Sequence, residues 1–128
     1  MNNDEFKNKL TAQEYAVLRE AGTEAPFSGR FYYENPTGTY TCRACGAALF
    51  PSNAKFHSDM PGLAGWPSFD DSIPGSVEYR DDTSLGMHRT EAICACCKSH
   101  LGHLFDDPQS KTGKHLCINS VCLDIDPK

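Results

Sequence analysis

Two pairs of cysteines constrain the fold of this chain more than any other feature of its sequence. Cys42 and Cys45 form one Cys-x-x-Cys pair, and Cys94 and Cys97 form a second pair far along the chain. Gly46 follows the first pair and permits the tight turn of a metal-binding knuckle. Two such knuckles make a closed tetrahedral sulfur site, which is typical of structural zinc. We therefore expect one zinc ion to tie together distant parts of the chain.

Several alternatives to this zinc site remain open at the level of sequence. A redox-active Cys-x-x-Cys pair normally opens a helix in a βαβ unit, and the pattern here does not indicate one. Buried thiols without a metal, and iron in place of zinc, also fit the spacing. Cys96 stands between Cys94 and Cys97 and competes with them for the ligand role, although parity with the first pair favours Cys94 and Cys97.

Length and charge limit the classes of protein to which the chain can belong. Its 128 residues suit a single domain, 1–128, with its own hydrophobic core. No stretch approaches the ~18 apolar residues of a membrane helix, and residues 1–10 lack the apolar centre of a secretory signal. The formal net charge of -5 disfavours binding to nucleic-acid phosphates. We expect a cytoplasmic monomer without nucleic-acid or membrane partners.

Residues 1–24 form the helical part of the sequence. Thr11 and Glu14 make a capping box, which predicts a helix from about residue 12 to residue 20 that stops near Gly22. From residue 31 onward the pattern is one of short strands and turns. The expected strands cover residues 31–33, 39–41, 47–50, 76–80, 87–93, 101–105 and 116–125. The sequence therefore predicts a mainly β fold of small twisted antiparallel sheets with a helical N-terminal arm.

The last predicted strand contains the candidate nucleophile, Cys117, which stands outside the metal-site spacing. The thiolate is the reactive form of cysteine, and nearby imidazole or positive charge produces it near neutral pH. His100, His103 and His115 are available for that role. A buried, inert thiol is the alternative reading of Cys117. In a regular strand, residues 117, 119, 121, 123 and 125 would share one face.

Several motifs make the whole sequence resemble the methionine-R-sulfoxide reductases of the B type. The matching pieces occur in the same order over roughly residues 5 to 125, and they include Cys42-Arg43-Ala44-Cys45-Gly46, Gly65-Trp66-Pro67-Ser68-Phe69, Arg89-Thr90-Glu91, His100-Leu101-Gly102-His103 and Cys117-Ile118-Asn119-Ser120. Gly22-Thr23-Glu24 also looks like the family's N-terminal stretch. The resemblance implies the Mss4-like, β-tent type of fold with a structural zinc.

The same resemblance implies thiol-dependent reduction of the R epimer of methionine sulfoxide, and so repair of oxidised proteins or peptides. Cys117 would attack the sulfoxide sulfur and be left as a sulfenic acid, while His103 would assist protonation of the oxygen. Trp66 would form the apolar wall for the substrate methyl group. The other residues implied in the site are His100 and Asn119 as catalytic groups, and Asp107 and His115 as substrate-binding groups.

The chain departs from this family in the position of its spare cysteines. Many members carry a resolving cysteine in the segment 59–64 before Trp66, but here that segment is longer than usual and has none. Cys117 and Cys122 would lie about 16 Å apart in a regular strand, and a disulfide needs Cα atoms within ~7 Å. Cys96 is the other spare thiol. We expect a one-cysteine mechanism in which thioredoxin or a small thiol reduces the sulfenic acid directly.

A second departure is His115, which stands where the family usually has arginine, two residues before Cys117. Arginine keeps its charge at any working pH, whereas an unperturbed histidine loses its charge near pH ~6.5. If His115 takes over the role of the arginine, stabilisation of the thiolate should weaken above that pH.

Two other classes of protein compete with the reductase reading. A zinc-stabilised binding module needs the four zinc cysteines, but it does not need Cys117, His103 and Asn119 together. A cysteine hydrolase using Cys117 and His103 would need an oxyanion hole, and a cysteine within a strand offers no evident one. The reductase reading accounts for more of the motifs than either alternative.

Overall fold

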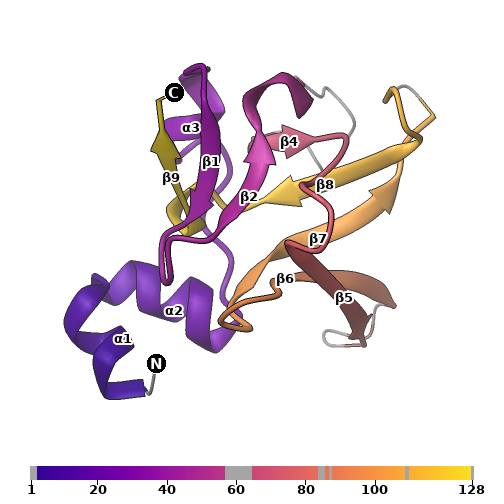
Figure 1. Cartoon of the computed structure of the whole chain (residues 1–128). Helices are drawn as coiled ribbons and strands as arrows, with labels where there is room; N and C mark the ends of the chain where they lie inside the picture. Colours follow the sequence, from indigo (N-terminus) through magenta and orange to yellow (C-terminus); the bar gives the residue numbers. More distant parts are fainter. Residues whose placement is uncertain (1–2, 57–64, 84–85, 87, 109, 128) are drawn as a thin grey trace.

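Two antiparallel sheets form the body of the protein (Figure 1). The structure is a computed structural model that describes residues 3–56, 65–83, 86, 88–108 and 110–127. Within these residues the smaller sheet has the order β2-β1-β9 and the larger sheet the order β3-β4-β8-β7-β6-β5. The smaller sheet consists of β1 Thr39–Cys42, β2 Ala48–Pro51 and β9 Leu123–Asp126. The larger sheet consists of β3 Lys55–Phe56, β4 Ser68–Phe69, β5 Val77–Asp82, β6 Arg89–Cys94, β7 His100–Asp106 and β8 Lys114–Ile118.

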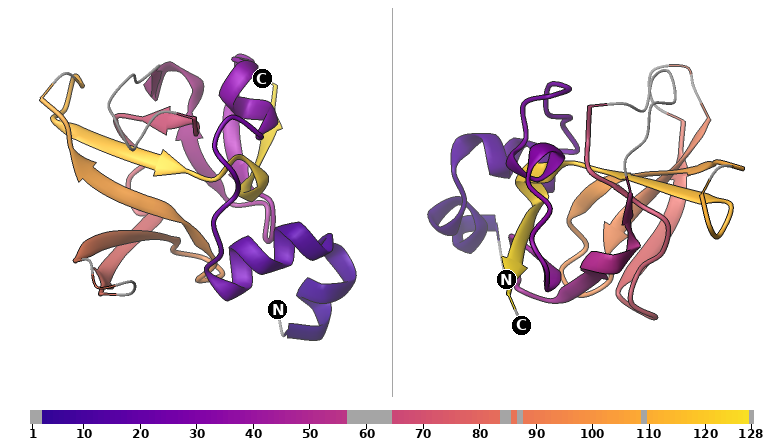
Figure 2. Two further views of the ribbon diagram at one scale, coloured as in Figure 1. Left: turned by 180° about the vertical axis from the view of Figure 1, so that it is seen from behind. Right: turned by 90° about the horizontal axis from the view of Figure 1, so that it is seen from above.

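The N-terminal arm is helical, as predicted, with α1 at Asn3–Lys9 and α2 at Ala12–Glu20. The capping box is confirmed, because the Thr11 hydroxyl accepts from the backbone N–H of Glu14 at 3.1 Å and the Glu14 carboxylate accepts from that of Thr11 at 2.9 Å. Val17 and Leu18 are buried. They belong to the arm that lies beside both sheets (Figure 2), where α2 contacts β7 and a 3-10 turn, η3 Ser120–Cys122.

The prediction of a strand over residues 31–33 is wrong, because Arg30–Tyr33 form a short helix, α3. One helical turn places the Phe31 ring in the core, 5.2 Å from the ring of Tyr40 and edge-on to it. The Phe31 backbone N–H donates to the Ser120 hydroxyl at 2.9 Å. This tertiary hydrogen bond satisfies an amide at the start of the helix, which sequence spacing alone does not reveal.

The prediction of one continuous strand over residues 116–125 is also wrong. The chain leaves the larger sheet at the end of β8, makes the 3-10 turn η3, and enters the smaller sheet as β9. β8 pairs with β4 and β7, whereas β9 pairs with β1. Residues 117, 119, 121, 123 and 125 therefore do not share one face. The straight-strand separation of Cys117 and Cys122 does not apply either.

The other predicted strands are observed with small shifts of their ends. The strand expected at 87–93 is β6, Arg89–Cys94, and Met87 lies outside the described residues. The strand expected at 47–50 is β2, Ala48–Pro51, and it includes Pro51, which an edge strand tolerates because its outer amide needs no partner. The segment 59–64 also lies outside the described residues. No described helix has the length and apolar character needed to cross a membrane.

Candidate active site and metal centre

Four cysteine sulfurs meet where the two sheets approach each other, with Cys42 at the end of β1 and Cys94 at the end of β6. The sulfurs of Cys42, Cys45, Cys94 and Cys97 all lie within 4.8 Å of one another. The Cys42–Cys97 distance is 3.8 Å and the Cys45–Cys94 distance is 3.7 Å. A zinc–sulfur bond of ~2.3 Å gives a tetrahedron with edges of about 3.8 Å. The cluster therefore has the size and chemistry for one zinc-like ion.

The two knuckles have the same local geometry. The backbone N–H of Gly46 donates to the Cys42 carbonyl at 2.8 Å, and that of Lys98 donates to the Cys94 carbonyl at 2.8 Å. Both residues have positive φ, 81° at Gly46 and 64° at Lys98. In the second knuckle a lysine thus takes the position that a glycine takes in the first. Cys96 is exposed and is outside the four-sulfur cluster.

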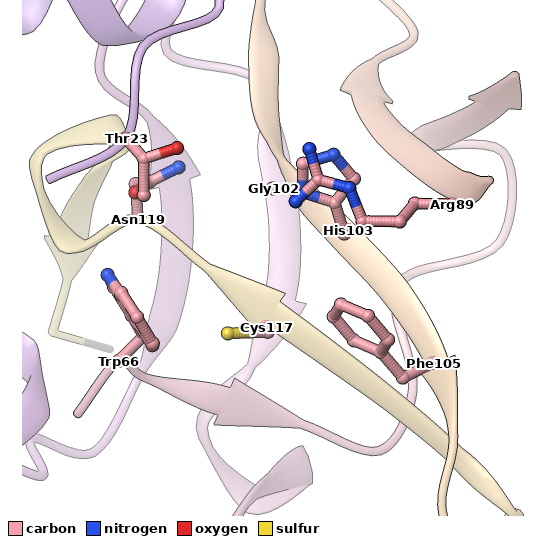
Figure 3. Close-up of a pocket in the computed structure, with 8 residues that line it drawn as sticks. All are labelled: Thr23, Trp66, Arg89, Gly102, His103, Phe105, Cys117 and Asn119. Atoms are coloured by element: carbon pink, nitrogen blue, oxygen red, sulfur yellow. The ribbon is translucent and has the colours of Figure 1, made fainter. Parts of the chain in front are cut away.

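A separate cavity of about 80 Å³ opens beside Cys117. Its walls come from the segment between α2 and α3, from the turn before β4, from strands β6, β7 and β8, and from the residue after β8. The sulfur of Cys117 points toward the side of Trp66, and the Phe105 ring lies on the opposite side of Cys117 (Figure 3). The lining residues are Thr23, Trp66, Arg89, Gly102, His103, Phe105, Cys117 and Asn119.

Strand pairing places Cys117 between two neighbours. In the larger sheet Cys117 is opposite Ser68 on β4 and opposite His103 on β7. Burial raises the pKa of the Cys117 thiol to about 12, with a smaller contribution from the Glu24 carboxylate. The resting sulfur is therefore a neutral thiol near neutral pH.

His103 has a defined hydrogen-bond partner at the edge of this cavity. Its Nε2 lies 2.7 Å from a carboxylate oxygen of Asp82, at the end of β5. A carboxylate only accepts, so Nε2 carries the proton and donates it to this hydrogen bond. Arg89 also donates to the same oxygen of Asp82, at 3.4 Å. Asp82 thus orients the imidazole and sets its tautomer, and the remaining ring nitrogen is Nδ1.

Two other lining residues are held by the backbone of Glu24. The Trp66 indole N–H donates to the Glu24 carbonyl at 3.1 Å, and the Glu24 N–H donates to the Asn119 side-chain oxygen at 3.1 Å. The Asn119 amide group in turn donates to the Leu101 carbonyl at 3.0 Å. These bonds determine the orientations of the indole and of the side-chain amide.

Three residues predicted for the site do not line this cavity in the described part of the chain. His100 is buried, and its Nδ1 is 2.6 Å from the Glu91 carboxylate. Its ring centroid is 5.4 Å from that of His103, so it contacts the site indirectly. The other two, Asp107 and His115, are both buried and are hydrogen-bonded to each other.

His115 joins two buried polar groups. Its Nδ1 is 3.1 Å from the Asp107 carboxylate, and its Nε2 is 2.8 Å from the Ser68 hydroxyl. Burial lowers the pKa of His115, so the ring is neutral near neutral pH, donating to Asp107 and accepting from Ser68. A neutral ring outside the cavity cannot supply the positive charge that an arginine would. The expectation of a charge-dependent pH profile through His115 therefore loses its basis.

The structure adds pocket residues that sequence reasoning did not assign. Arg89 and Thr23 stand in motifs that carried the family resemblance, and Phe105 follows His103 by two residues on β7. The alternation of a strand could have revealed Phe105. Gly102 permits the close approach of β7 and β8, because a Cβ there would lie 2.0 Å from the Cys117 carbonyl oxygen.

Buried neutral histidines predict a loss of stability in acid. Burial lowers the pKa of His100 and of His115 below their ordinary value, so the unfolded chain takes up protons first as the pH falls. Their contribution is fully present above about pH 6.5 and is lost as the pH drops below it. We expect His115→Gln to show a smaller loss of urea midpoint between about pH 7.5 and about pH 5.5 than the unmodified protein.

The measurement is urea unfolding followed by circular dichroism, with bound metal quantified at both pH values. The control is His88→Gln, which changes an exposed histidine. Parallel pH dependences for His115→Gln and the unmodified protein would contradict the assignment of His115 as a buried neutral group.

These features define a class of protein, namely mainly β proteins with a four-cysteine metal centre and a separate pocket built around one cysteine thiol. A family model described as the SelR domain matches residues 10–127, and the chain belongs to this family.

The similar curated proteins agree with this assignment. The chain is 50% identical to the peptide methionine sulfoxide reductase MsrB of Methanosarcina barkeri, over 95% of this chain and 84% of that protein. It is 47% identical to the peptide methionine sulfoxide reductase MsrB of Leifsonia xyli subsp. xyli, over 99% and 90% of the two chains. It is 44% identical to the mitochondrial methionine-R-sulfoxide reductase B3 of Mus musculus, over 96% of this chain and 47% of that protein.

Proposed function

We propose that this protein reduces the R epimer of methionine sulfoxide in oxidised proteins or peptides, with Cys117 as the nucleophile. The observation that carries the proposal is the position of the Cys117 sulfur, in a small cavity lined by the Trp66 and Phe105 rings with His103 at its edge. Family membership over most of the chain supports the same reaction. The activity makes this an oxidoreductase of protein repair after oxidative stress.

The reaction transfers one oxygen from the substrate to the enzyme. The Cys117 sulfur attacks the sulfoxide sulfur, and the sulfoxide oxygen is protonated as its bond to that sulfur weakens. Methionine leaves with both of its carbon–sulfur bonds intact, and Cys117 retains the oxygen as a sulfenic acid. We assign the proton transfer to His103, which Asp82 holds in position through Nε2. Because the resting thiol is neutral, its proton passes to Nδ1 of His103 as substrate binds, and Nδ1 then delivers that proton to the sulfoxide oxygen.

The lining residues suggest how one epimer is selected. Trp66 and Phe105 offer apolar walls for the methyl group, while His103, Arg89 and Asn119 offer donors for the oxygen. The sulfoxide sulfur is chiral. Only one epimer can place its methyl group against the apolar walls and its oxygen against the donors at the same time. We propose that three further residues position the site without touching the substrate. His100 supports the ring of His103, and Asp107 and His115 hold β8 in place.

The metal centre we propose to hold one structural zinc ion through Cys42, Cys45, Cys94 and Cys97. The spacing of the four sulfurs supports this. Bound zinc would supply a rigid link between the two sheets. The ion would take no part in the reaction steps above, which use Cys117 and the residues around it.

Reduction of the sulfenic acid we propose to come directly from thioredoxin or a small thiol. Cys122 is buried, with its S–H donating to the His100 carbonyl at 3.3 Å, and burial raises its pKa. A neutral, buried thiol is a poor partner for disulfide formation. Cys96 lies on the knuckle of the metal centre.

One turnover without reductant should leave Cys117 as a sulfenic acid that dimedone traps, and mass spectrometry of the digested protein would detect the adduct. We expect Cys122→Ser to give the same yield of adduct per protein as the unmodified chain. A Cys117–Cys122 or Cys117–Cys96 disulfide after one turnover would refute the one-cysteine mechanism.

The domain organisation, the oligomeric state and the compartment of the enzyme are also part of the proposal. We propose one domain spanning residues 1–128, because the buried core includes Phe6 from α1, Phe50 from the smaller sheet and Leu116 from the larger one. We also propose a cytoplasmic monomer. The seven cysteines, all among the described residues, form no disulfide, which suits a reducing compartment.

The test of the function compares the consumption of the two epimers of methionine sulfoxide. Racemic N-acetylmethionine sulfoxide with excess dithiothreitol is incubated with the metal-loaded protein, and each epimer is followed by chiral chromatography. We expect loss of the R epimer alone. Consumption of neither epimer by folded, metal-loaded protein would refute the proposal and favour a binding module.

A further inference from the structure

Glu24 is a buried carboxylate whose backbone is hydrogen-bonded to two residues of the Cys117 cavity, and the mechanism above does not use it. The residue is 3% exposed. It precedes α3 in the chain and does not itself line the cavity that contains Cys117. A buried acid in a protein of this size normally has a structural or functional reason, because taking its charge out of water is costly.

Three groups of Glu24 hold three different parts of the site. Its backbone N–H donates to Asn119, its carbonyl accepts from the Trp66 indole, and its Oε1 accepts from the Val121 N–H at 3.0 Å. Two of these partners line the cavity, and the third lies in η3, the turn that follows Cys117. Glu24 thus links one wall of the cavity to the chain carrying the nucleophile.

The second carboxylate oxygen, Oε2, is enclosed without a hydrogen-bond partner among the described residues. Gly29 packs closely on this side, since a Cβ there would lie 2.8 Å from Oε2 and 2.2 Å from the Ser120 Cβ. A charge enclosed by protein is screened less than a charge in water. Beside the larger effect of burial, the Glu24 carboxylate raises the pKa of the Cys117 thiol.

We propose that Glu24 is a positioning residue whose backbone and Oε1 hold the Trp66, Asn119 and η3 side of the cavity, and whose buried carboxylate repels negative charge on the Cys117 sulfur. The proposal builds on the assignment of Cys117 as the nucleophile but concerns the resting state, before substrate binds. A thiol kept neutral at rest resists chance oxidation and alkylation.

Several charged and titratable groups among the described residues act on Cys117 or on Glu24. His103 and Arg89 share the cavity with Cys117. Glu24 raises the pKa of Cys117, and it also raises that of Cys122, which is buried in η3. Burial in turn raises the pKa of Glu24, while the backbone N–H groups of Ser120 and Val121 oppose that rise.

The test compares thiol reactivity in Glu24→Gln and in the unmodified protein, both loaded with metal and without substrate. Glutamine keeps an oxygen for the Val121 N–H and removes the charge. Iodoacetamide alkylation is measured from about pH 6 to about pH 9, and Cys117 is resolved by peptide mass spectrometry. We expect Cys117 to react at least about threefold faster in the variant, which corresponds to a change of about half a pKa unit.

Two references make the result specific. The exposed Cys96 should react at an unchanged rate in every protein, and Glu20→Gln, which removes an exposed charge at the end of α2, should leave Cys117 unchanged. An equal Cys117 rate in folded Glu24→Gln would overturn the proposal. If that variant does not fold, Glu24→Asp keeps the charge and must react no faster than the unmodified protein, and a faster rate would overturn the proposal. Neither measurement uses reductase activity, so its result is independent of the proposed function.

Discussion

Cys117→Ser should abolish reduction of the R epimer, with kcat/KM falling by at least about a thousandfold. A serine hydroxyl is similar in size to a thiol, so the cavity lined by Trp66 and Phe105 should keep its shape. The hydroxyl lacks the soft sulfur that attacks a sulfoxide, and it cannot keep the oxygen as a sulfenic acid. The measurement is the initial rate of R-epimer loss with excess dithiothreitol, at several substrate concentrations.

Cys96→Ser is the matched control, because it removes an exposed thiol that is neither in the cavity nor in the four-sulfur cluster. It should retain the full rate. Thermal melting of both variants should match the unmodified protein. Appreciable R-epimer reduction by folded Cys117→Ser would show that another thiol performs the chemistry.

Loss of one metal ligand should have the largest effect on stability. We expect Cys94→Ser to release the metal and to lose its cooperative thermal unfolding transition. A structural zinc ion contributes about 10–16 kcal/mol in small zinc-binding peptides, and a whole domain of ordinary stability has only about 5–15 kcal/mol. Cys94 ends β6 and Cys42 ends β1, so the centre joins two sheets that have no strand in common.

Metal content by elemental analysis and melting by circular dichroism test this expectation. A strong chelator acting on the unmodified protein should reproduce the effect, and added zinc should reverse it. Cys96→Ser again serves as the control, because it alters the same knuckle without removing a ligand. A cooperative transition at an unchanged temperature in metal-free Cys94→Ser would contradict the structural role of the centre.

Local sequence signals predicted the local structure well. The capping box at Thr11 and Glu14 forms as expected, because its hydrogen bonds join residues three apart. The four cysteines converge as their spacing indicated, since few other arrangements suit paired knuckles. Most strands lie where alternation placed them.

The sequence-based predictions failed where a distant partner determines the local structure. Residues 31–33 are as apolar and aromatic as a strand, but they form a helical turn because Phe31 packs on Tyr40 and bonds to Ser120. The segment 116–125 alternates like one strand, yet it crosses from one sheet to the other through η3. Alternation cannot distinguish one long strand from two short ones that belong to different sheets.

The candidate site also has features that the sequence predicted and features that only the tertiary structure revealed. Motifs alone identified Cys117 as a candidate nucleophile, and the cavity now places Trp66, His103 and Asn119 beside it. The motifs did not indicate that His115 is buried against Asp107 and Ser68, nor that Asp82 orients His103. Residue type determines which chemistry a side chain can perform, and this much is legible in the sequence.

By itself the sequence determined the metal ligands' spacing, the helical arm and the thiol available for chemistry, because these depend on residue type and on neighbours along the chain. The tertiary structure alone decided which histidine reaches the cavity, which thiols are buried and where Glu24 lies. Those properties depend on strand register and on contacts between residues far apart in the sequence. Burial then sets each pKa through desolvation, a quantity that exists only once the chain is folded.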